Sequence, residues 1–509
     1  MWGVPLRIKE HPILSFDQQQ KLSFRFNDEL MKGYAGDSIA AALHANNVKV
    51  FSKSLKYDRS RGFFCGIGKC SSCLMEVNGV PNVRTCIAPL TDGVEVRSQK
   101  RFAAWPKKQD EISNFSKKMV VDILVVGGGP AGLEAAAQAA SLGARVLIVD
   151  ENQKLGGQLV KQTHKFFGSK EEKAGTRGIV IADVLDTLLS DDPLSKNVSV
   201  MLDATVFGVY EQVNVDGFTF GVSKREDYQS VFYEVQCASV VFAVGAMENM
   251  LLFPGNDLPG VYGAGAVQTL MNVYGVKPGN TVLMVGAGNV GLIVSYQLLQ
   301  AGITVERVVE AAPVIGGYHV HAAKLRRCGV SIDTRYSIKE VFGKDAVEGA
   351  VVVQLDDDWQ PVSGSEETVE CDTVCLAVGL SPSTRLLSQM GVYMETIAEA
   401  GGFVAVHDDQ MQTTVSGVFV AGDASGIEEA STAMIEGKIA GVAAAKAVGI
   451  KHKKIDQRLT KYKEELARLR AGPFGEKPRR AKEKIDERWR NFRQLPPVET
   501  GGLKGDLQR

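Results

Sequence analysis

Four cysteines in one short stretch of the chain could hold a redox metal cluster. They follow the spacing C-x4-C-x2-C-x12-C and are Cys65, Cys70, Cys73 and Cys86. Thiolates at a C-x4-C-x2-C…C spacing ligate a [2Fe–2S] cluster. Three of them fall within nine residues, so their loop must wrap tightly around the cluster, and Gly66 and Gly68 supply the backbone freedom for such a loop. We predict that all four cysteines are iron ligands.

A structural zinc site, or thiols without any metal, is the alternative for these cysteines. Zinc sites usually pair their ligands as two C-x2-C units, and the x4 gap with a distant fourth cysteine departs from that pattern. The neighbouring sequence also favours the cluster. Residues 21–28 alternate like a strand, residues 36–48 have helical spacing after an Asp cap, and residues 73–86 read as two strands joined at Asn78-Gly79. This order predicts a β-grasp ferredoxin-like domain over residues 1–100.

A glycine-rich turn after the next apolar strand predicts a dinucleotide site. Gly127, Gly129 and Gly132 form G-x-G-x-x-G between the strand "VVDILVV" and an alanine-rich helix. The turn also contains Pro130 and Ala131. Its glycines allow the backbone to approach a pyrophosphate closely, and the helix N-terminus favours negative charge.

An acid about twenty residues beyond this turn is expected to bind a ribose hydroxyl. Asp150 is the first candidate and Glu151 the second. Asp150 stands five residues before Leu155, which is its offset in flavoproteins with two dinucleotide domains. We add Gly157 and Gln158, which follow Leu155, to the predicted site.

A second turn of the same kind predicts a second nucleotide site. Gly286, Gly288 and Gly291 follow another strand, Asn289 lies between them, and Glu310 ends the next strand. Glu310 would bind a free 2′-hydroxyl and repel a 2′-phosphate, so it favours NAD over NADP, although nearby Arg307 weakens that inference. The alternatives are a structural adenine nucleotide, such as ATP or ADP, or an empty fold.

Two later features resemble the glutathione-reductase-like flavoproteins and assign FAD to the first turn. "SGVFVAGDASGIEEAS" contains Gly422 and Asp423, and in that class the aspartate accepts a hydrogen bond from the ribityl chain. "VVFAVGAMEN", with Gly245, and "TVCLAVGLSPST" match the crossings between its FAD and NAD domains. The resemblance predicts an α/β fold with a linker at 101–117, an FAD-binding domain at 118–252 and 380–450, an NAD-like domain at 253–379, and a helical tail at 451–509.

Composition restricts the class of protein. The chain has 509 residues, enough for several domains, and 58 basic against 59 acidic residues. This balance gives no indication of nucleic-acid binding. We expect neither a signal peptide nor a transmembrane segment, because the N-terminus lacks the pattern of a signal sequence and no apolar run is long enough. Cysteine ligands without an export signal favour the reducing cytoplasm.

The remaining reactive residues do not predict a second reaction. Disulfide reductases carry a closely spaced cysteine pair beside the flavin, whereas the cysteines outside the cluster loop are expected to be core thiols: Cys237, Cys328, Cys371 and Cys375. His319 and His321 are spaced i, i+2, so we expect a surface or nucleotide-side role rather than a metal site. For His164 we expect a solvated loop histidine, with a place near the flavin as the alternative.

Together, these motifs resemble the FAD- and NAD-like subunit of heteromeric amine and amino-acid dehydrogenases. This group includes sarcosine oxidase α, opine oxidase, dye-linked L-proline dehydrogenase and hydrogen cyanide synthase. The resemblance covers residues 1 to about 450 and adds the stretches "DLPGVYGAGAVQTLMN" and "VIGGYHVHAAKLRRCGV". It implies that a β-type, D-amino-acid-oxidase-like flavoprotein subunit oxidises the substrate C–N bond, while this chain relays the electrons to an external acceptor.

Two departures from that group limit the prediction. Many members have a cysteine-rich C-terminal segment for a further cluster, but no cysteine follows Cys375 in this sequence. Sarcosine oxidase α also continues into a folate-binding region that this sequence lacks. We therefore expect one cluster and no folate chemistry.

The last residues carry a strong basic excess. Residues 451–509 contain 18 Lys or Arg and 9 Asp or Glu, a balance of +9. A helical apolar stripe is formed by Ile455, Leu459, Tyr462, Leu466 and Leu469, and a second helix is predicted around Ile485, Trp489 and Phe492, ending before Pro496. The stripe could clamp a partner or a neighbouring copy, or it could pack on the chain's own acidic body.

The sequence is compatible with three functions. The first is an electron-transfer subunit that passes electrons between FAD and the cluster. The second is a self-sufficient NADH-dependent reductase of an external electron carrier. The third is a scaffold subunit whose second nucleotide is structural. The sequence identifies no catalytic residue for amine oxidation.

Overall fold

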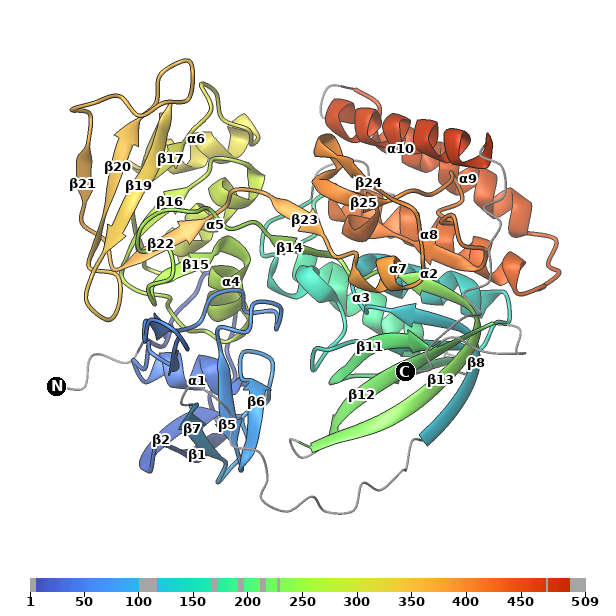
Figure 1. The fold of residues 1–509 in the computed structure, drawn as a ribbon, viewed down its shortest axis with the longest axis horizontal. Helices are drawn as coiled ribbons and strands as arrows, with labels where there is room; N and C mark the ends of the chain where they lie inside the picture. Colours follow the sequence, from blue (N-terminus) through green and yellow to red (C-terminus); the bar gives the residue numbers. More distant parts are fainter. Residues whose placement is uncertain are drawn as a thin grey trace, which may run out of the picture.

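The chain folds into an N-terminal domain, two α/β domains that contain the predicted nucleotide sites, and a C-terminal helical pair (Figure 1). We call these two the first and second nucleotide-binding domains, after the prediction. The computed structural model describes residues 6–99, 117–166, 173–190, 196–210, 217–226, 229–472 and 475–494. The linker predicted at 101–117 lies outside these ranges except for Lys117, which begins a strand. The predicted domain boundaries stay predictions.

The N-terminal domain is a five-stranded sheet covered by one helix, which confirms the ferredoxin-like fold. Its strand order is β2-β1-β7-β5-β6, with β1 parallel to β7. Asn78 and Gly79 both have positive φ angles in the two-residue hairpin between β5 and β6, as this kind of turn requires. The elements are β1 (Lys21–Phe26), β2 (Glu29–Tyr34), α1 (Ile39–Ala45), β3 (Ser52–Lys53), β4 (Ser60–Arg61), β5 (Leu74–Val77), β6 (Val80–Arg84) and β7 (Glu95–Ser98).

The first nucleotide-binding domain is built on a sheet of order β10-β9-β8-β13-β12-β11, with β26 also paired to β13. Two helices, α2 and α8, pack closely on it, since a Cβ at Gly437 or Gly441 would lie 2.1 or 2.2 Å from a carbonyl oxygen of α2. The elements are β8 (Lys117–Val126), α2 (Pro130–Ser141), β9 (Val146–Val149), α3 (Gly178–Ser190), β10 (Val198–Met201), β11 (Ala204–Tyr210), β12 (Phe218–Glu226), β13 (Gln229–Phe242), α7 (Arg385–Gln389), β24 (Met394–Ile397), β25 (Gly402–Ala405), β26 (Val418–Val420) and α8 (Ala430–Ala447).

The second nucleotide-binding domain has an all-parallel sheet of order β15-β22-β16-β17-β18 and a smaller antiparallel sheet, β19-β20-β21. It is joined to the first by the pair β14 (Ala246–Glu248) and β23 (Leu380–Pro382), which are the two crossings expected from the sequence. The other elements are β15 (Val261–Gly263), α4 (Ala264–Gln268), β16 (Thr281–Val285), α5 (Asn289–Gln300), β17 (Thr304–Glu310), α6 (His319–Arg327), β18 (Ser331–Thr334), β19 (Tyr336–Phe342), β20 (Gly349–Gln354), β21 (Glu367–Val369) and β22 (Thr373–Leu376).

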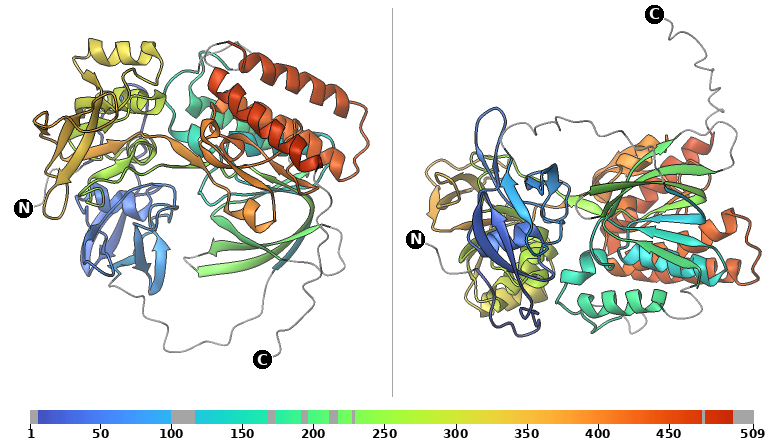
Figure 2. Two further views of the ribbon diagram at one scale, coloured as in Figure 1. Left: turned by 45° about the horizontal axis from the view of Figure 1, so that its top comes forward. Right: turned by 90° about the horizontal axis from the view of Figure 1, so that it is seen from below.

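The C-terminal helices α9 (Ile455–Leu469) and α10 (Glu476–Gln494) lie side by side on the first nucleotide-binding domain (Figure 2). The apolar stripe of α9 packs inward. Ile455, Leu459 and Leu466 are buried in the core beneath α8, and Tyr462 and Leu469 are partly buried against it. The clamp hypothesis for this stripe is therefore wrong, because the chain itself covers the stripe. The predicted end of the second helix at Pro496 lies outside the described residues.

The outer helix of this pair is also anchored. Ile485 of α10 is buried in a small cluster with Ile397 and Val404, and Phe492 stacks on Tyr393 with ring centroids 5.6 Å apart. Helices α9 and α10 are thus part of the folded domain.

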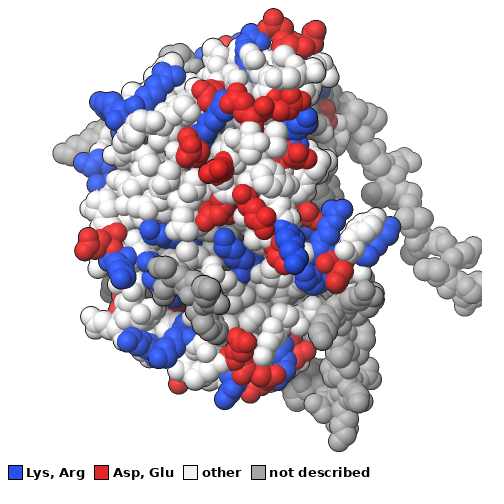
Figure 3. All heavy atoms as spheres, turned by 90° about the vertical axis from the view of Figure 1, so that its left-hand side faces the viewer, with Lys and Arg blue, Asp and Glu red and all other residues white. Residues whose placement is uncertain are grey.

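Charges are mixed over the face formed by the N-terminal and second nucleotide-binding domains. Lys and Arg alternate there with Asp and Glu (Figure 3). No helix within the described ranges combines the length and the apolar character needed to cross a membrane.

Candidate flavin and iron–sulfur site

One cavity gathers most of the residues predicted to bind FAD. It encloses about 1760 Å³ of empty space, including its open mouth. Eleven predicted residues line it: Gly127, Gly129, Pro130, Ala131, Asp150, Glu151, Gly157, Gln158, Gly245, Gly422 and Asp423. They come from segments that are far apart in sequence, so the cavity exists only in the folded chain.

The glycine turn is shaped to accept a pyrophosphate. Gly127 has φ +105°, and a Cβ there would lie 2.3 Å from the carbonyl oxygen of Ala243. Gly132 does not line the cavity. It packs the helix against the turn, since a Cβ there would lie 1.8 Å from the carbonyl oxygen of Gly127. A Cβ at Gly129 would meet only Gly157, at 3.8 Å, so its face toward the cavity is open. These features fit the adenosine diphosphate half of FAD.

Asp150 and Glu151 have different roles in this structure. Asp150 Oδ2 accepts the N–H of Gly128 at 2.6 Å and Oδ1 accepts the N–H of Asn152 at 2.8 Å, so Asp150 fixes the glycine turn. Burial raises the pKa of Asp150. Glu151 pairs instead with Lys69 at 2.8 Å and Arg84 at 3.5 Å. Both of these partners belong to the N-terminal domain, so Glu151 ties the cluster loop to the flavin domain.

Asp423 also lines this cavity, on the loop that begins at Gly422. Burial raises the pKa of Asp423 to about 7. Gly422 has φ +68°, in the left-handed region, and its backbone N–H donates to Glu436 at 2.9 Å. The loop is thus held from behind while Asp423 faces the cavity.

The four cysteines of the N-terminal domain converge as a cluster requires. Cys65, Cys73 and Cys86 are buried and Cys70 is partly exposed. Hydrogen bonding from Cys70 and then Cys86 lowers the pKa of Cys65, and hydrogen bonding from Cys86 lowers the pKa of Cys73. These hydrogen bonds show that the four sulfur atoms lie close together.

The backbone of the loop also faces these sulfurs. The N–H of Gly68 donates to Cys86 Sγ at 3.3 Å, and that of Ser72 donates to Cys70 Sγ at 3.5 Å. Gly66 and Gly68 have φ +65° and +71°, the conformations expected of a wrapped loop. A [2Fe–2S] cluster takes two thiolates on each of its two irons. Four cysteines whose sulfur atoms contact one another match that donor set.

The cluster loop forms part of the flavin cavity wall. Cys65, Ile67 and Lys69 all line the cavity. Two more contacts fix this junction: Arg84 donates to Thr205 Oγ1 at 3.2 Å, and Arg225 donates to the carbonyl oxygen of Ile87 at 3.2 Å. A cluster ligand and the flavin site are therefore adjacent, with no further domain between them.

Sequence reasoning missed a buried lysine and a glutamate at this junction. Lys161 and Glu248 both line the cavity. Lys161 Nζ donates to the carbonyl oxygen of Gly265 at 2.8 Å, and Glu248 Oε1 accepts the N–H of the same residue at 2.7 Å. Burial lowers the pKa of Lys161 to about 8 and raises that of Glu248. The only sequence signal was the position of Lys161, four residues beyond Gly157.

The second glycine turn has the same construction as the first. A Cβ at Gly291 would lie 2.0 Å from the carbonyl oxygen of Gly286, and the space beside Gly288 is open. Asn289 Oδ1 accepts the N–H of Tyr318 at 2.8 Å, which closes the following loop over the turn. The next residue, Val290, lines the flavin cavity. The second glycine turn therefore adjoins the flavin cavity at Val290.

Arg307 is engaged by side chains of this protein and so is less free to bind a 2′-phosphate. It pairs with Asp333 at 2.5 Å and with Glu367 at 2.6 Å, and its guanidinium lies over the ring of Tyr336. Arg307 therefore weakens the predicted preference for NAD over NADP less than its place in the sequence suggested.

Two sequence expectations are corrected here. Cys237, Cys371 and Cys375 are buried, but Cys328 is exposed, because it follows the last residue of α6 at the surface. His164 is not a solvated loop histidine. Its ring stacks on Phe166, its Nδ1 is buried without a hydrogen-bond partner among the described residues, and burial lowers its pKa to about 4.

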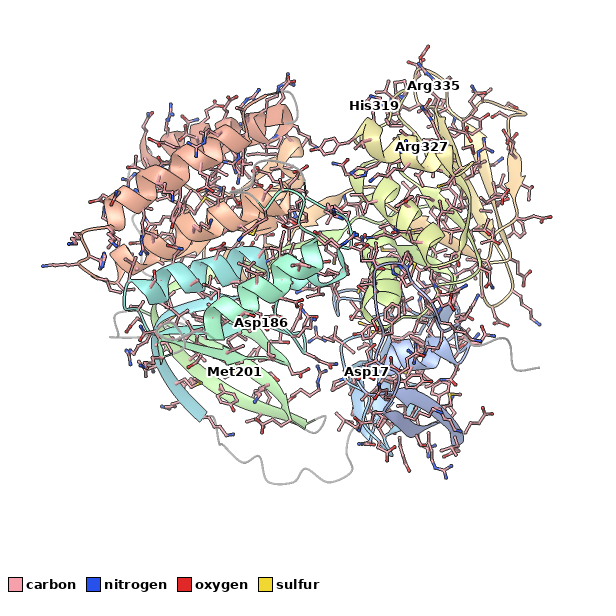
Figure 4. The ribbon with its side chains drawn as sticks, turned by 180° about the vertical axis from the view of Figure 1, so that it is seen from behind. Asp17, Asp186, Met201, His319, Arg327 and Arg335 are labelled. Atoms are coloured by element: carbon pink, nitrogen blue, oxygen red, sulfur yellow. The ribbon has the colours of Figure 1, made fainter. Side chains whose placement is uncertain are left out.

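The two histidines of α6 face different environments. His319 is exposed at the start of the helix (Figure 4), whereas His321 is buried and stacks on Tyr318. His319 thus has a surface position, as expected, and His321 does not.

Comparison with known proteins identifies the class. Residues 121–437 match the family described as pyridine nucleotide-disulphide oxidoreductase, and residues 19–101 match the 2Fe-2S iron-sulfur cluster binding domain. Because the first match covers more than half of the chain, the chain belongs to the pyridine nucleotide-disulphide oxidoreductase family. It is an oxidoreductase whose cofactors are FAD and a [2Fe–2S] cluster.

Individual relatives confirm the resemblance inferred from the motifs. The alpha subunit of sarcosine oxidase from Rhizobium meliloti (strain 1021) is 28% identical over 492 residues, covering 85% of this chain and 47% of the relative. An opine oxidase subunit from Agrobacterium tumefaciens (strain Ach5) is 30% identical over 335 residues, covering 64% of this chain and 65% of the relative. The chain thus spans about half of the first relative and about two thirds of the second.

The solved structure of L-proline dehydrogenase from P. horikoshii has a similar fold. It superposes with a TM-score of 0.65 at 23% identity, over 90% of this chain and 79% of that one.

Proposed function

We propose that this chain is the electron-transfer subunit of a heteromeric dehydrogenase for an amine or amino acid of the proline, sarcosine or opine type. A β-type, D-amino-acid-oxidase-like flavoprotein subunit would oxidise the C–N bond of the substrate. The chain would receive the electrons and pass them to an external acceptor, and we propose the cytoplasm as its compartment. Two relatives named as subunits of sarcosine oxidase and opine oxidase support this assignment.

The position of Cys65 carries the proposal. It is a predicted iron ligand and also lines the cavity that contains the Gly129 turn. FAD, when bound, accepts electrons in pairs and releases them singly, and a [2Fe–2S] cluster carries one at a time. Sites that share a wall suit such a relay.

The surroundings of the cluster give the relay a direction. Cys65 is buried and lines the flavin cavity, whereas Cys70 is partly exposed beside the exposed residue Ser71. An external acceptor would approach at the Cys70 edge. Glu151 ties the cluster loop to the flavin domain through its ion pair with Lys69.

Purification from the native source tests the proposal. The chain should arrive with a second flavoprotein of roughly amine-oxidase size. Only that complex should reduce a dye with proline, sarcosine or an opine as substrate, and the isolated chain should show at most NADH–dye activity. If the native chain purifies alone and turns over NADH rapidly with a ferredoxin or quinone, the subunit proposal fails.

A self-sufficient NADH-dependent reductase is the second candidate. Val290, beside the second glycine turn, lines the flavin cavity, which supports access of a nicotinamide to the flavin. Rapid mixing with NADH is the direct test, because this candidate requires flavin bleaching within one turnover. Binding of ATP or ADP without any bleaching by NADH would favour the scaffold hypothesis, in which the second nucleotide is structural.

A further inference from the structure

Three carboxylates converge at the Gly422 end of the flavin cavity. Asp423 and Glu428 line the cavity. Glu436 lies behind them on α8, where its Oε2 accepts the N–H of Gly422 at 2.9 Å and the hydroxyl of Ser425 at 2.8 Å. Glu436 therefore holds the loop that presents Asp423.

The C-terminal helices supply the cations for these carboxylates. Arg470, just beyond α9, binds Glu428 and Glu436, each at 2.6 Å. Lys482 of α10 binds Glu436 at 2.8 Å and donates to the carbonyl oxygen of Ser425 at 2.9 Å. Only 13% of the Arg470 side chain and 14% of the Lys482 side chain are exposed.

Because these ion pairs are buried, the loss of one partner has a large energetic cost. The side chains of Glu428 and Glu436 are 5% and 2% exposed, and removing one partner of a buried pair leaves an uncompensated charge. Burial alone would raise the pKa of Glu436, but Lys482 and Arg470 lower it to about 2. Glu436 is therefore ionised and depends on cations that arrive from the end of the chain.

We propose that the C-terminal segment contributes to the flavin site. Its residues Lys482 and Arg470 are positioning residues that set the affinity for FAD and the reduction potential of the flavin. They act through Glu436, which holds the Gly422 loop, and they offset the negative charge of Glu428 and Glu436 behind that loop. Reduction adds negative charge to the flavin, so offsetting these carboxylates favours the reduced form. The inference rests on the proposed placement of FAD at the first glycine turn.

The key variant is Lys482→Met in the full chain, which removes the charge while keeping much of the side-chain length. Titration of the FAD-free protein with FAD should give a Kd at least tenfold higher, and the midpoint potential of the bound flavin should fall. Lys482→Arg should restore both values toward those of the unmodified chain. Lys484→Met is the matched control, because Lys484 lies on the same helix but pairs with Glu399 at the surface, and it should change neither value.

A second variant separates charge from packing. Glu436→Gln keeps one acceptor oxygen, which can serve both Gly422 and Ser425 as Oε2 does now, but removes the negative charge. It should therefore raise the midpoint potential, the opposite of Lys482→Met. The double variant Glu436→Gln with Lys482→Met should recover FAD affinity toward that of Glu436→Gln alone. If Lys482→Met does not fold, comparing Glu436→Gln with the double variant still tests the coupling between Lys482 and Glu436.

Two results would overturn the inference. The first is unchanged FAD affinity and potential in Lys482→Met. The second is potentials that shift in the same direction in Lys482→Met and Glu436→Gln, together with an equal loss of unfolding free energy in the FAD-free chains, which indicates packing alone. A different failure, retention of FAD by Gly129→Val, would instead overturn the placement of FAD.

Discussion

Asp150 and Glu310 hold the two glycine turns of this protein in the same way. Asp150 accepts the N–H groups of Gly128 at 2.6 Å and Asn152 at 2.8 Å. Glu310 accepts those of Ala287 at 2.7 Å and Ala312 at 3.0 Å. Each acid therefore orders its own turn, in addition to any contact with a nucleotide ribose.

Cys70→Ser tests the cluster ligands. A serine hydroxyl is a much poorer ligand for the irons of a cluster than a thiolate, so the visible absorption and the low-temperature EPR signal of the reduced cluster should disappear. FAD should stay bound, because the first glycine turn belongs to another domain. Metal analysis of the unmodified chain should find about two irons per chain, and zinc in their place would contradict the prediction.

Gly129→Val and Gly288→Val form a matched pair for the two nucleotide sites. The valine side chain would fill the open face of each turn. Gly129→Val should give flavin-free protein, whereas Gly288→Val should keep FAD and lose binding of the second nucleotide. Flavin absorbance after gel filtration and titration with NADH measure the two effects. An exchange of phenotypes would mean that the cofactors are assigned to the wrong turns.

Nucleotide preference at the second site is tested by equilibrium titration. NAD(H) should bind more tightly than NADP(H), because Glu310 repels a 2′-phosphate and Arg307 is engaged by Asp333 and Glu367. The double variant Asp333→Asn with Glu367→Gln should reduce the preference for NAD(H) over NADP(H), because Arg307 loses both of its carboxylate partners. Tighter binding of NADP(H) by the unmodified chain would refute the role of Glu310.

Leu459→Ala tests the internal packing of the tail. Leu459 is 6% exposed within the core beneath α8, so the substitution should lower the free energy of unfolding by about 2–5 kcal/mol. Thr460→Ala, at the exposed neighbouring position, should change it by less than about 0.5 kcal/mol. Urea unfolding followed by circular dichroism measures both. Equal, small effects would show that the stripe is not core.

Asp423 predicts a pH dependence of stability in the FAD-free chain. Burial raises its pKa to about 7 in the folded chain, from an ordinary value of 3.8, so folding favours its protonated form. The contribution is fully present below about pH 4 and is lost as the pH rises toward 7. Asp423→Asn should remove this part of the dependence, which urea unfolding at about pH 4, 5, 6 and 7 would detect. Parallel curves for the two proteins would contradict the assignment.

The sequence by itself determined the parts of this protein whose chemistry depends on neighbours in the chain. The spacing of Cys65, Cys70 and Cys73 predicts a cluster because one loop must supply all three thiolates. The turn at Gly127 to Gly132 predicts a dinucleotide site because strand, turn and helix are consecutive. The hairpin at Asn78-Gly79 was predictable for the same reason.

Only the tertiary structure decided how these parts meet. Helical periodicity shows that α9 has an apolar stripe, but not which surface the stripe covers, because that depends on the competing surfaces of the folded chain. Glu151 was a candidate for binding ribose, yet it pairs with Lys69 of another domain. Cys65 adjoins the flavin cavity, and Lys482 reaches Glu436 behind it. These contacts join residues far apart in sequence, and no local pattern encodes them, since they arise when the domains pack.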